Sequence, residues 1–212
     1  MGRPVSRSKC SDHEPLSAPA WKATHHRLVC LRSIIAATGD GAARSSLAIM
    51  ADWEIRPASI ADVEAVAELR SVVLRADLER LGRYDAHRVR QRLRDGFASA
   101  HTWVIEVGGA FAGCVSLRPA NDACWLEHFY LAPHLQGRGI GAAVLAGLLE
   151  QCDRDGTLVR LNVLQGSPAR RLYERHGFRL ETEDPVDVYM VRAPAGCLIH
   201  TTGEQGRRPE RR

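Results

Sequence analysis

The feature that most limits how this chain can fold is a glycine-rich turn between a β-rich segment and an apolar helix. The turn, Gln136-Gly137-Arg138-Gly139-Ile140-Gly141, follows the predicted strand Trp125–Leu131 and leads into the predicted helix Gly139–Cys152. Glycines let the backbone come close to a ligand, and amides at a helix start attract an anion such as a pyrophosphate. Arg138 can add a charge-assisted hydrogen bond to that anion.

Three alternatives stand beside the anion site. A glycine-rich connector without a ligand is the common outcome for an isolated G-x-G, and a Walker loop needs Gly-Lys-Ser/Thr, which the turn lacks. Residues 137–142 satisfy G-x-G-x-x-A, but a dinucleotide-binding turn follows its strand immediately and precedes an acidic residue by about 20 positions. Here Pro133 and four other residues follow Leu131, and the next strand ends in Leu164-Gln165, so a dinucleotide site is disfavoured.

Hydrophobic periodicity and capping residues predict the element order β-α-α-β-β-β-α-β-α-β-β. Ser59 and Asp62 have the spacing of a capping box, and a second helix is expected after Asp85. Ser167 is expected to cap a short helix over 168–176 that Gly177 ends. The order indicates an α/β domain without internal repeats. The expected strands are Trp53–Arg56, His101–Val107, Phe111–Leu117, Trp125–Leu131, Leu158–Leu164, Phe178–Glu183 and Val186–Arg192.

The formal charge of +4 belongs to the ends of the chain. Residues 1–49 hold seven basic and three acidic groups, residues 193–212 hold four and two, and residues 50–192 hold 18 and 20. The patterned segment therefore carries a net charge of −2, which disfavours a nucleic-acid partner. No apolar run reaches the ~18 residues of a membrane-spanning helix, so a soluble protein without a membrane partner is expected.

The six cysteines form no C-x-x-C pair and no Cys/His ladder, which predicts no metal site and reduced thiols in the cytoplasm. Cys114, Cys124 and Cys152 lie in apolar segments, where a free cysteine usually behaves as a small buried hydrophobe. The expected organisation is a disordered extension or an upstream mis-start over 1–49, a domain over 50–192 and a disordered basic tail over 193–212. A transit peptide is an alternative for the first segment.

With these motifs in place, the sequence resembles the GNAT (Gcn5-related N-acetyltransferase) family. The turn over residues 136–141 matches the family's Q/R-x-x-G-x-G/A pattern, and residues 167–178 match its second hallmark helix. Residues 55–58 are similar to the family's first strand, and the resemblance runs from about Trp53 to Arg192. The chain departs from the family before the second helix, where Gly166-Ser167 stands in place of the frequent asparagine.

The resemblance implies a fold and a cofactor. The fold is a single mixed, largely antiparallel sheet flanked by helices, and the co-substrate is acetyl-CoA, with no metal. Acetyl-CoA is expected in a V-shaped opening between the strands Trp125–Leu131 and Leu158–Leu164, with its diphosphate on the amides of the turn. The residues expected to bind it are Tyr130, Leu131, Gln136, Gly137, Arg138, Gly139, Gly141, Ala142 and Ser167.

Glu127 is the expected catalytic base. Strand parity places it on one face with Trp125, Phe129 and Leu131, and places Leu126, His128 and Tyr130 on the other face. Desolvation between two aromatic residues is expected to raise the pKa of Glu127 toward that of a useful base, and in similar proteins this strand often supplies the base. The alternative for Glu127 is a structural ion pair with a helix arginine. His128, which parity turns away from Glu127, is a weaker candidate base.

Tyr173 has two interpretations. Its helical spacing with Ala169, Leu172 and His176 predicts a core residue, whereas the resemblance makes it the proton donor to the CoA thiolate. The acceptor pocket is expected to be walled by the two predicted helices before residue 100 and by their link over residues 72–84, with Arg83 and Tyr84 as contacts. The four alternating arginines of the second helix are interpreted as its solvated face; they are Arg88, Arg90, Arg92 and Arg94.

The resulting hypothesis is an N-acetyltransferase that moves acetyl from acetyl-CoA directly to a primary amine of a small molecule. A protein N-terminal or lysine acetyltransferase is one alternative, and a non-catalytic acyl-CoA-binding module is another. The acceptor pocket consists of variable helix and loop side chains, so the acceptor is left unnamed, and a homodimer is left open.

Overall fold

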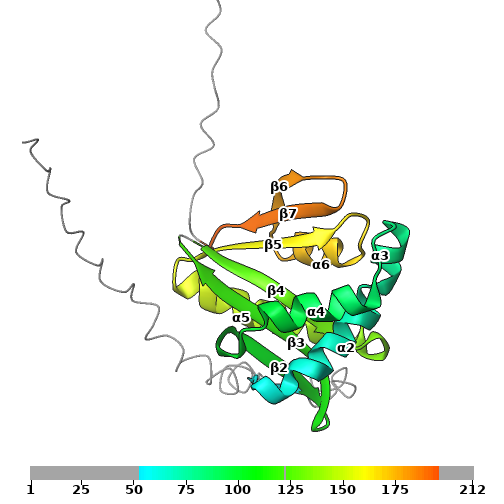
Figure 1. Cartoon of the computed structure of the whole chain (residues 1–212). Coiled ribbons are helices and arrows are strands. Elements are labelled where there is room, and N and C mark those ends of the chain that lie inside the picture. Colours follow the sequence, from blue (N-terminus) through cyan, green and yellow to red (C-terminus); the bar gives the residue numbers. More distant parts are fainter. Residues whose placement is uncertain (1–52, 122, 196–212) are drawn as a thin grey trace, which may run out of the picture. The chain divides into compact units, whose positions relative to one another are not determined.

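The computed structural model describes residues 53–121 and 123–195, and their strands form one sheet (Figure 1). The strand order is β1-β2-β3-β4-β5-β7-β6. The β4 and β5 strands are parallel, and the other neighbours are antiparallel. The expected mixed, largely antiparallel sheet is therefore confirmed. The strands are β1 (Trp53–Pro57), β2 (Thr102–Val107), β3 (Ala110–Ala120), β4 (Ala123–Leu131), β5 (Leu158–Leu164), β6 (Arg179–Glu183) and β7 (Asp187–Arg192).

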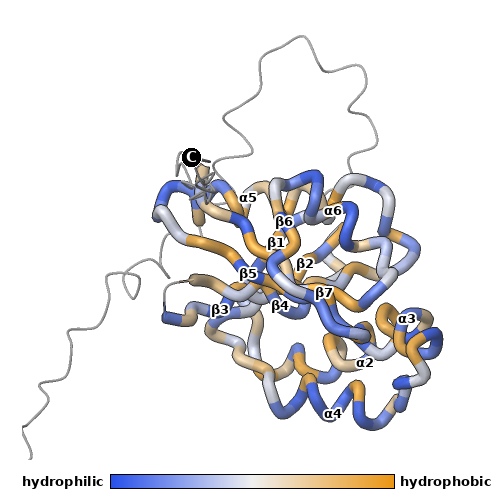
Figure 2. Tube along the Cα trace, turned by 90° about the horizontal axis from the view of Figure 1, so that it is seen from above, coloured by the Kyte–Doolittle hydropathy of each residue, from blue (hydrophilic) through white to orange (hydrophobic). Residues whose placement is uncertain are grey.

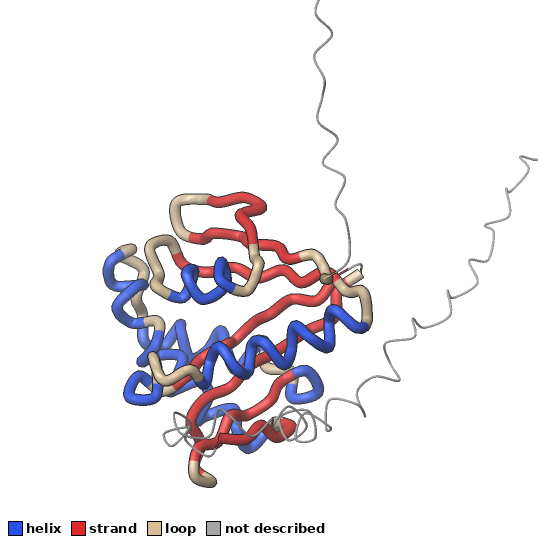
Figure 3. Tube along the Cα trace, turned by 180° about the vertical axis from the view of Figure 1, so that it is seen from behind, coloured by secondary structure: helices blue, strands red, loops and turns tan. Residues whose placement is uncertain are grey.

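Helices cover both faces of this sheet. Figure 1 shows α2 and α4 in front of it, and Figure 3, from behind, shows the long α5 lying across the opposite face. The α3 helix falls within residues 72–84, where a link between two helices was expected, so the link contains a helix of its own. The helices are α2 (Val63–Val73), α3 (Arg75–Arg80), α4 (Ala86–Gly96), α5 (Ile140–Arg154) and α6 (Ala169–Arg175), with short 3-10 turns η3 (Ile60–Asp62), η4 (Ser99–His101) and η5 (Pro133–Leu135).

Local capping explains where most of these helices begin and end. The backbone N–H of Ser59 donates to Asp62 Oδ2 at 2.7 Å, which confirms the capping box, although the first turn is the 3-10 turn η3. Asp85 accepts from the backbone N–H of Arg88 at 2.8 Å and so starts α4. Gly177, with φ +86°, follows the end of α6 as expected.

The prediction that the Ser167 side chain caps α6 is wrong. The helix begins at Ala169, its N-cap position is held by Pro168, and no side chain caps it there. Ser167 contributes its carbonyl instead, which accepts from the backbone N–H of Arg170 at 3.2 Å. The Ser167 side chain is therefore not committed to the helix start.

The core consists of apolar layers on the two faces of the sheet. In α5, six residues are buried, and their spacing places them on one face of the helix, so the expected burial on more than one side is not seen. Figure 2 shows α4 alternating hydrophilic and hydrophobic residues, as expected for a helix with one face on the core. Cys114 and Cys152 are buried free thiols, and burial raises the pKa of each to about 12, so both stay protonated at neutral pH.

The disordered segments expected over residues 1–49 and 193–212 lie outside the described residues, except for residues 193–195. Within the described part of the chain, no helix is long and apolar enough to cross a membrane. A search of the same residues for groups of His, Cys, Asp or Glu that could hold a metal ion found none.

Candidate functional site

The sheet opens between β4 and β5. These strands pair only at their first residues, through Ala123 with Leu158, Cys124 with Val159 and Trp125 with Arg160. Beyond Trp125, β4 continues for six residues to Leu131 without a partner residue on β5. The expected V-shaped opening between the two strands is therefore present, and β4 offers an unpaired backbone edge along it.

A β-bulge at His128 shapes the β4 side of this opening. On β3, Ser116 pairs with Glu127 and Cys114 pairs with Tyr130, so His128 and Phe129 together lie opposite one β3 residue. His128 has φ +50°, a left-handed backbone conformation that is uncommon for a residue other than glycine. A bulge adds one residue to a strand and so reverses the alternation of faces beyond it.

The parity prediction for β4 is wrong beyond the bulge. Tyr130 pairs with Cys114 and belongs with it to the core cluster beneath α2 and α4, on the same face as Glu127. Phe129 is turned the other way, because a Cβ added at Gly141 of α5 would lie 3.8 Å from its ring. Glu127 is therefore not enclosed between two aromatic residues.

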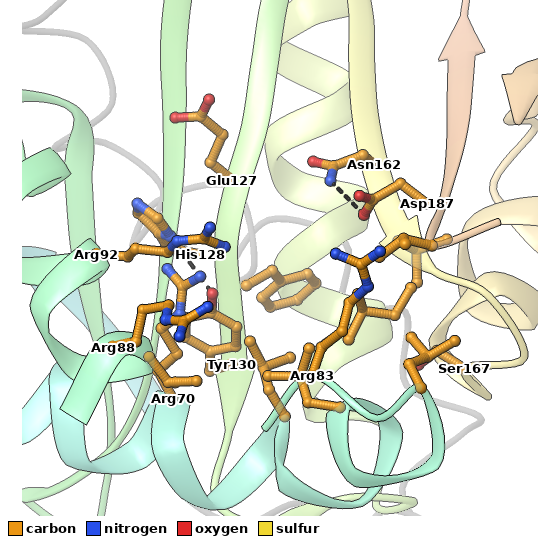
Figure 4. Close-up of a pocket in the computed structure, with 18 of the residues that line it drawn as sticks. Arg70, Arg83, Arg88, Arg92, Glu127, His128, Tyr130, Asn162, Ser167 and Asp187 are labelled. Atoms are coloured by element: carbon orange, nitrogen blue, oxygen red, sulfur yellow. Dashed lines mark hydrogen bonds between the residues drawn. The ribbon is translucent and has the colours of Figure 1, made fainter. Parts of the chain in front are cut away.

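A cavity of about 930 Å³ occupies the opening between β4, β5 and the helices α2 to α4 (Figure 4). The β4 strand contributes Glu127, His128 and Tyr130 to its wall, and α6 contributes Tyr173. Ser167, at the end of the loop after β5, also lines it. The structure thus brings both expected catalytic residues and two of the expected cofactor-binding residues into one cavity.

Glu127 is held in an ion pair at this wall. Arg118 Nη2 donates to Glu127 Oε1 at 2.7 Å, and Arg118 Nε donates to Oε2 at 3.1 Å. The side chain of Glu127 remains 27% exposed, so the carboxylate still reaches solvent. The alternative of a structural ion pair is therefore present, although its arginine comes from strand β3 and not from a helix.

The two other polar side chains of β4 at the cavity are uncharged at neutral pH. Burial, together with the positive charge of Arg70, lowers the pKa of His128 to about 4. Burial raises the pKa of Tyr130 well above its usual value. His128 Nδ1 and the Tyr130 hydroxyl lie 3.4 Å apart.

Tyr173 is both a packed residue and a cavity residue. It is 8% exposed, and its ring stacks edge-on against Phe178 with centroids 5.8 Å apart. Burial raises the pKa of Tyr173 well above its usual value, and the neighbouring Tyr130 adds to the shift. The Tyr173 hydroxyl therefore keeps its proton across the neutral range and is available as a proton donor.

The glycine-rich turn has the geometry of an anion site. Gly137 and Gly139 have φ of +74° and +85°, which only glycine adopts without strain. The first helical bond of α5 runs from the N–H of Ala143 to the carbonyl of Gly139. The amides of Ile140, Gly141 and Ala142 consequently have no carbonyl of their own helix to donate to, and they fit a diphosphate.

The remaining turn residues support this conformation. The Gln136 side chain donates to the carbonyl of Leu131 at 2.8 Å and ties the turn to the end of β4. Leu131 itself is buried and packs against Gly113, where a Cβ would come within 3.3 Å of it. Arg138 is exposed at the start of α5.

The structure places the two residues expected at the acceptor side differently. Arg83 lines the cavity, but Tyr84 does not, because its hydroxyl lies 3.1 Å from Ser71 Oγ and its ring lies beneath the guanidinium of Arg75. Sequence analysis missed the arginines that α2 and α4 place at the cavity, which are Arg70, Arg88 and Arg92. The spacing of four between Arg88 and Arg92, which puts them on one helix face, is the signal that was available.

The comparisons with known proteins agree with this geometry. The family model described as acetyltransferase (GNAT) family matches residues 63–178, more than half of the chain. The chain therefore belongs to the GNAT acetyltransferase family, and it is an acyltransferase. No match to a curated protein sequence was found.

Solved structures with the same fold share little sequence with this chain. The PaiA N-acetyltransferase of Thermoplasma acidophilum, in complex with coenzyme A, has a TM-score of 0.56 at 21% identity and covers 66% of this chain and 98% of its own. PH1933 of Pyrococcus horikoshii has a TM-score of 0.55 at 22% identity, with coverage of 67% and 98%. The ribosomal-protein-S18-alanine N-acetyltransferase of Escherichia coli has a TM-score of 0.53 at 16% identity, with coverage of 70% and 97%.

Proposed function

We propose that this protein transfers acetyl from acetyl-CoA to a primary amine of a small molecule by direct transfer. The observation that carries the proposal is the opening between β4 and β5, which contains a cavity of about 930 Å³. That volume lies at the upper end of the range for small-molecule sites, roughly 300–1,000 Å³. The glycine-rich turn that follows β4 is suited to a diphosphate.

The cofactor fits the residues along this opening. The amides of Ile140 to Ala142 and the Arg138 side chain would bind the diphosphate, because they combine unpaired donors with positive charge. The unpaired edge of β4 near Tyr130 and Leu131 would pair with the amide groups of pantetheine, as an added strand pairs with an open sheet edge. Ser167 would contact the cofactor from the other side of the opening.

The chemistry requires a base and an acid. A C–N bond forms between the neutral amine and the acetyl carbonyl carbon, the C–S bond breaks, and the amine loses a proton while the thiolate gains one. Glu127 would take the amine proton, directly or through water, since its carboxylate lies at the cavity wall and reaches solvent. Tyr173 would protonate the thiolate, since its hydroxyl stays protonated at neutral pH.

A mass-spectrometric screen of amines and peptides with acetyl-CoA tests this function. The Glu127→Gln variant is expected to bind CoA as the wild type does and to lose turnover. Acetylation of peptides but not of small amines would replace the small-molecule acceptor with a protein acceptor. Binding of CoA without acetylation of any acceptor would favour an acyl-CoA-binding module.

A further inference from the structure

Arginines are concentrated on one wall of the cavity. Arg70 of α2 and Arg88 and Arg92 of α4 all line it, on the side where the bulge of β4 presents His128 and Tyr130 (Figure 4). Arg70 is close enough to both of these β4 residues to influence their pKa values. The wall therefore places several positive charges beside the part of the cavity that lies over β4.

The alternating arginines of α4 divide into two groups. Arg90 donates to both carboxylate oxygens of Glu68, with a shortest distance of 2.6 Å, and Arg94 binds Glu64 in the same way at 2.8 Å. These two arginines join α4 to α2 outside the cavity. Arg88 and Arg92 are exposed, as the interpretation of a solvated face expects, and they also line the cavity.

The cavity-facing arginines lack comparable partners. Among the described residues, Arg70 and Arg92 form no ion pair, and Arg88 has only an exposed contact of 3.7 Å with Asp85. The Nε atom of Arg70 is buried and has no hydrogen-bond partner. An unpaired donor of a charged group is costly to bury, so a site that keeps one is suited to a ligand that accepts from it.

The acidic residues of the cavity do not neutralise this wall. Glu127 is bound by Arg118, and Asp187 accepts from Asn162 at 2.9 Å. Asp184 accepts from two backbone amides of its own loop. Each carboxylate is thus committed to a partner other than Arg70 or Arg92.

The diphosphate of the cofactor does not account for these arginines either. Its expected amides lie in the turn before α5, and none of residues 136–142 lines the cavity. The arginine wall comes instead from α2 and α4, the elements expected to hold the acceptor. The wall is therefore suited to an anion on the acceptor.

We propose that the acceptor is an amine that carries an anionic group, a carboxylate or a phosphate, and that Arg70 and Arg92 bind this group. Arg88 adds positive charge at the rim. This inference rests on the proposed function, and it narrows the acceptor to amino acids, aminoalkyl phosphates and similar zwitterions. Guanidinium groups suit both anions, because they present paired donors in a planar arrangement.

Matched amines test the proposal. Acetylation rates are measured for 4-aminobutyrate against butylamine, and for phosphoethanolamine against ethanolamine, and each pair differs in the anionic group. We expect kcat/KM to favour the anionic member of at least one pair by about tenfold or more. Preference within the first pair identifies a carboxylate, and preference within the second identifies a phosphate.

Two variants with a matched control locate the effect. Arg92→Gln, at an exposed position, is expected to reduce the anionic preference by about tenfold through KM, and Arg70→Gln is expected to do the same. Arg90→Gln removes an arginine from the same helix but outside the cavity, and it is expected to leave the preference unchanged. Melting temperatures show whether the Arg70→Gln variant is folded. If it is not, the result for Arg92→Gln alone decides whether the anion site exists.

Calorimetric titration of the same four amines into the CoA-bound protein separates this inference from the proposed function. Binding of an anionic amine that Arg92→Gln weakens and Arg90→Gln does not supports the anion site even if no amine is acetylated. Equal rates and equal binding for the anionic and neutral members of both pairs would overturn the inference, while acetylation of those amines would leave the proposed function standing.

Discussion

The two glycines at the ends of α5 allow cofactor binding to be separated from protein stability. Gly139 precedes the helix with φ +85°, and Gly156 follows it with φ +63°. A Cβ added at either position meets no protein atom within 4 Å. Replacing either glycine with alanine therefore changes the backbone preference in the same way and creates no clash in the free protein.

The expected loss of stability is similar for the two variants. A left-handed conformation costs a residue with a Cβ about 1–2 kcal/mol. Alanine also lowers the conformational entropy of the unfolded chain, which offsets about 0.4–1 kcal/mol of this loss. The net loss is about 1 kcal/mol, which lowers the melting temperature of a domain of this size by ~2–4 °C.

The expected effect on the cofactor differs between the two variants. The methyl group of Gly139→Ala would lie beside the amides of Ile140 and Gly141, where the diphosphate would lie. A residue with a Cβ also disfavours the left-handed conformation at position 139 that exposes these amides. We expect the Kd for CoA to rise by about tenfold or more, equivalent to losing one hydrogen bond to a charged group. Gly156→Ala, at the far end of α5, is expected to bind CoA as the wild type does.

Calorimetric titration with CoA and thermal unfolding of both variants provide the measurements. The reasoning is refuted if Gly139→Ala and Gly156→Ala bind CoA equally well while losing the same stability. A much larger destabilisation of Gly139→Ala would instead show that this turn holds the fold together.

Two further predictions concern single side chains. Tyr173→Phe keeps the packing against Phe178 and is expected to reduce kcat by about a hundredfold with the Kd for CoA unchanged; a rate unchanged across pH in steady-state assays would remove Tyr173 as the proton donor. Arg56 donates a hydrogen bond to Asp62 and holds the pKa of that carboxyl far below its usual value. The ionised Asp62 therefore stabilises the fold at pH values above its unfolded pKa of about 4, and this stabilisation is lost as the pH falls below that value. Asp62→Asn should therefore unfold more easily than the wild type in urea at pH 7, with a difference that narrows between about pH 5 and pH 3; a difference constant with pH would contradict this linkage.

Local features of the sequence were sufficient for the element order, apart from the short helix α3, and for the glycine-rich turn before α5. The capping box of Ser59 and Asp62, the N-cap at Asp85 and the glycine at 177 each act within a few residues of chain. The glycines of the turn before α5 indicate a left-handed backbone conformation, which is also a local property. Such features could be predicted because neighbouring residues in sequence determine them.

The candidate site depended on contacts between distant segments. The bulge at His128 arises from the register between β3 and β4, and it decides that Glu127 shares a face with Tyr130 and not with Phe129. No alternation within β4 alone contains that information, because one inserted residue reverses every position after it.

The arginines of α4 show the same division between local and tertiary information. Their spacing places Arg88 and Arg92 on one helix face and Arg90 and Arg94 on another, and this much follows from the sequence. Only the packing of α4 against α2 decides that Glu64 and Glu68 pair with the second face, which leaves the first face to line the cavity. The sequence by itself thus determined the elements other than α3 and the glycine-rich turn. The tertiary structure decided which charged side chains meet at the cavity, because that depends on how the elements pack.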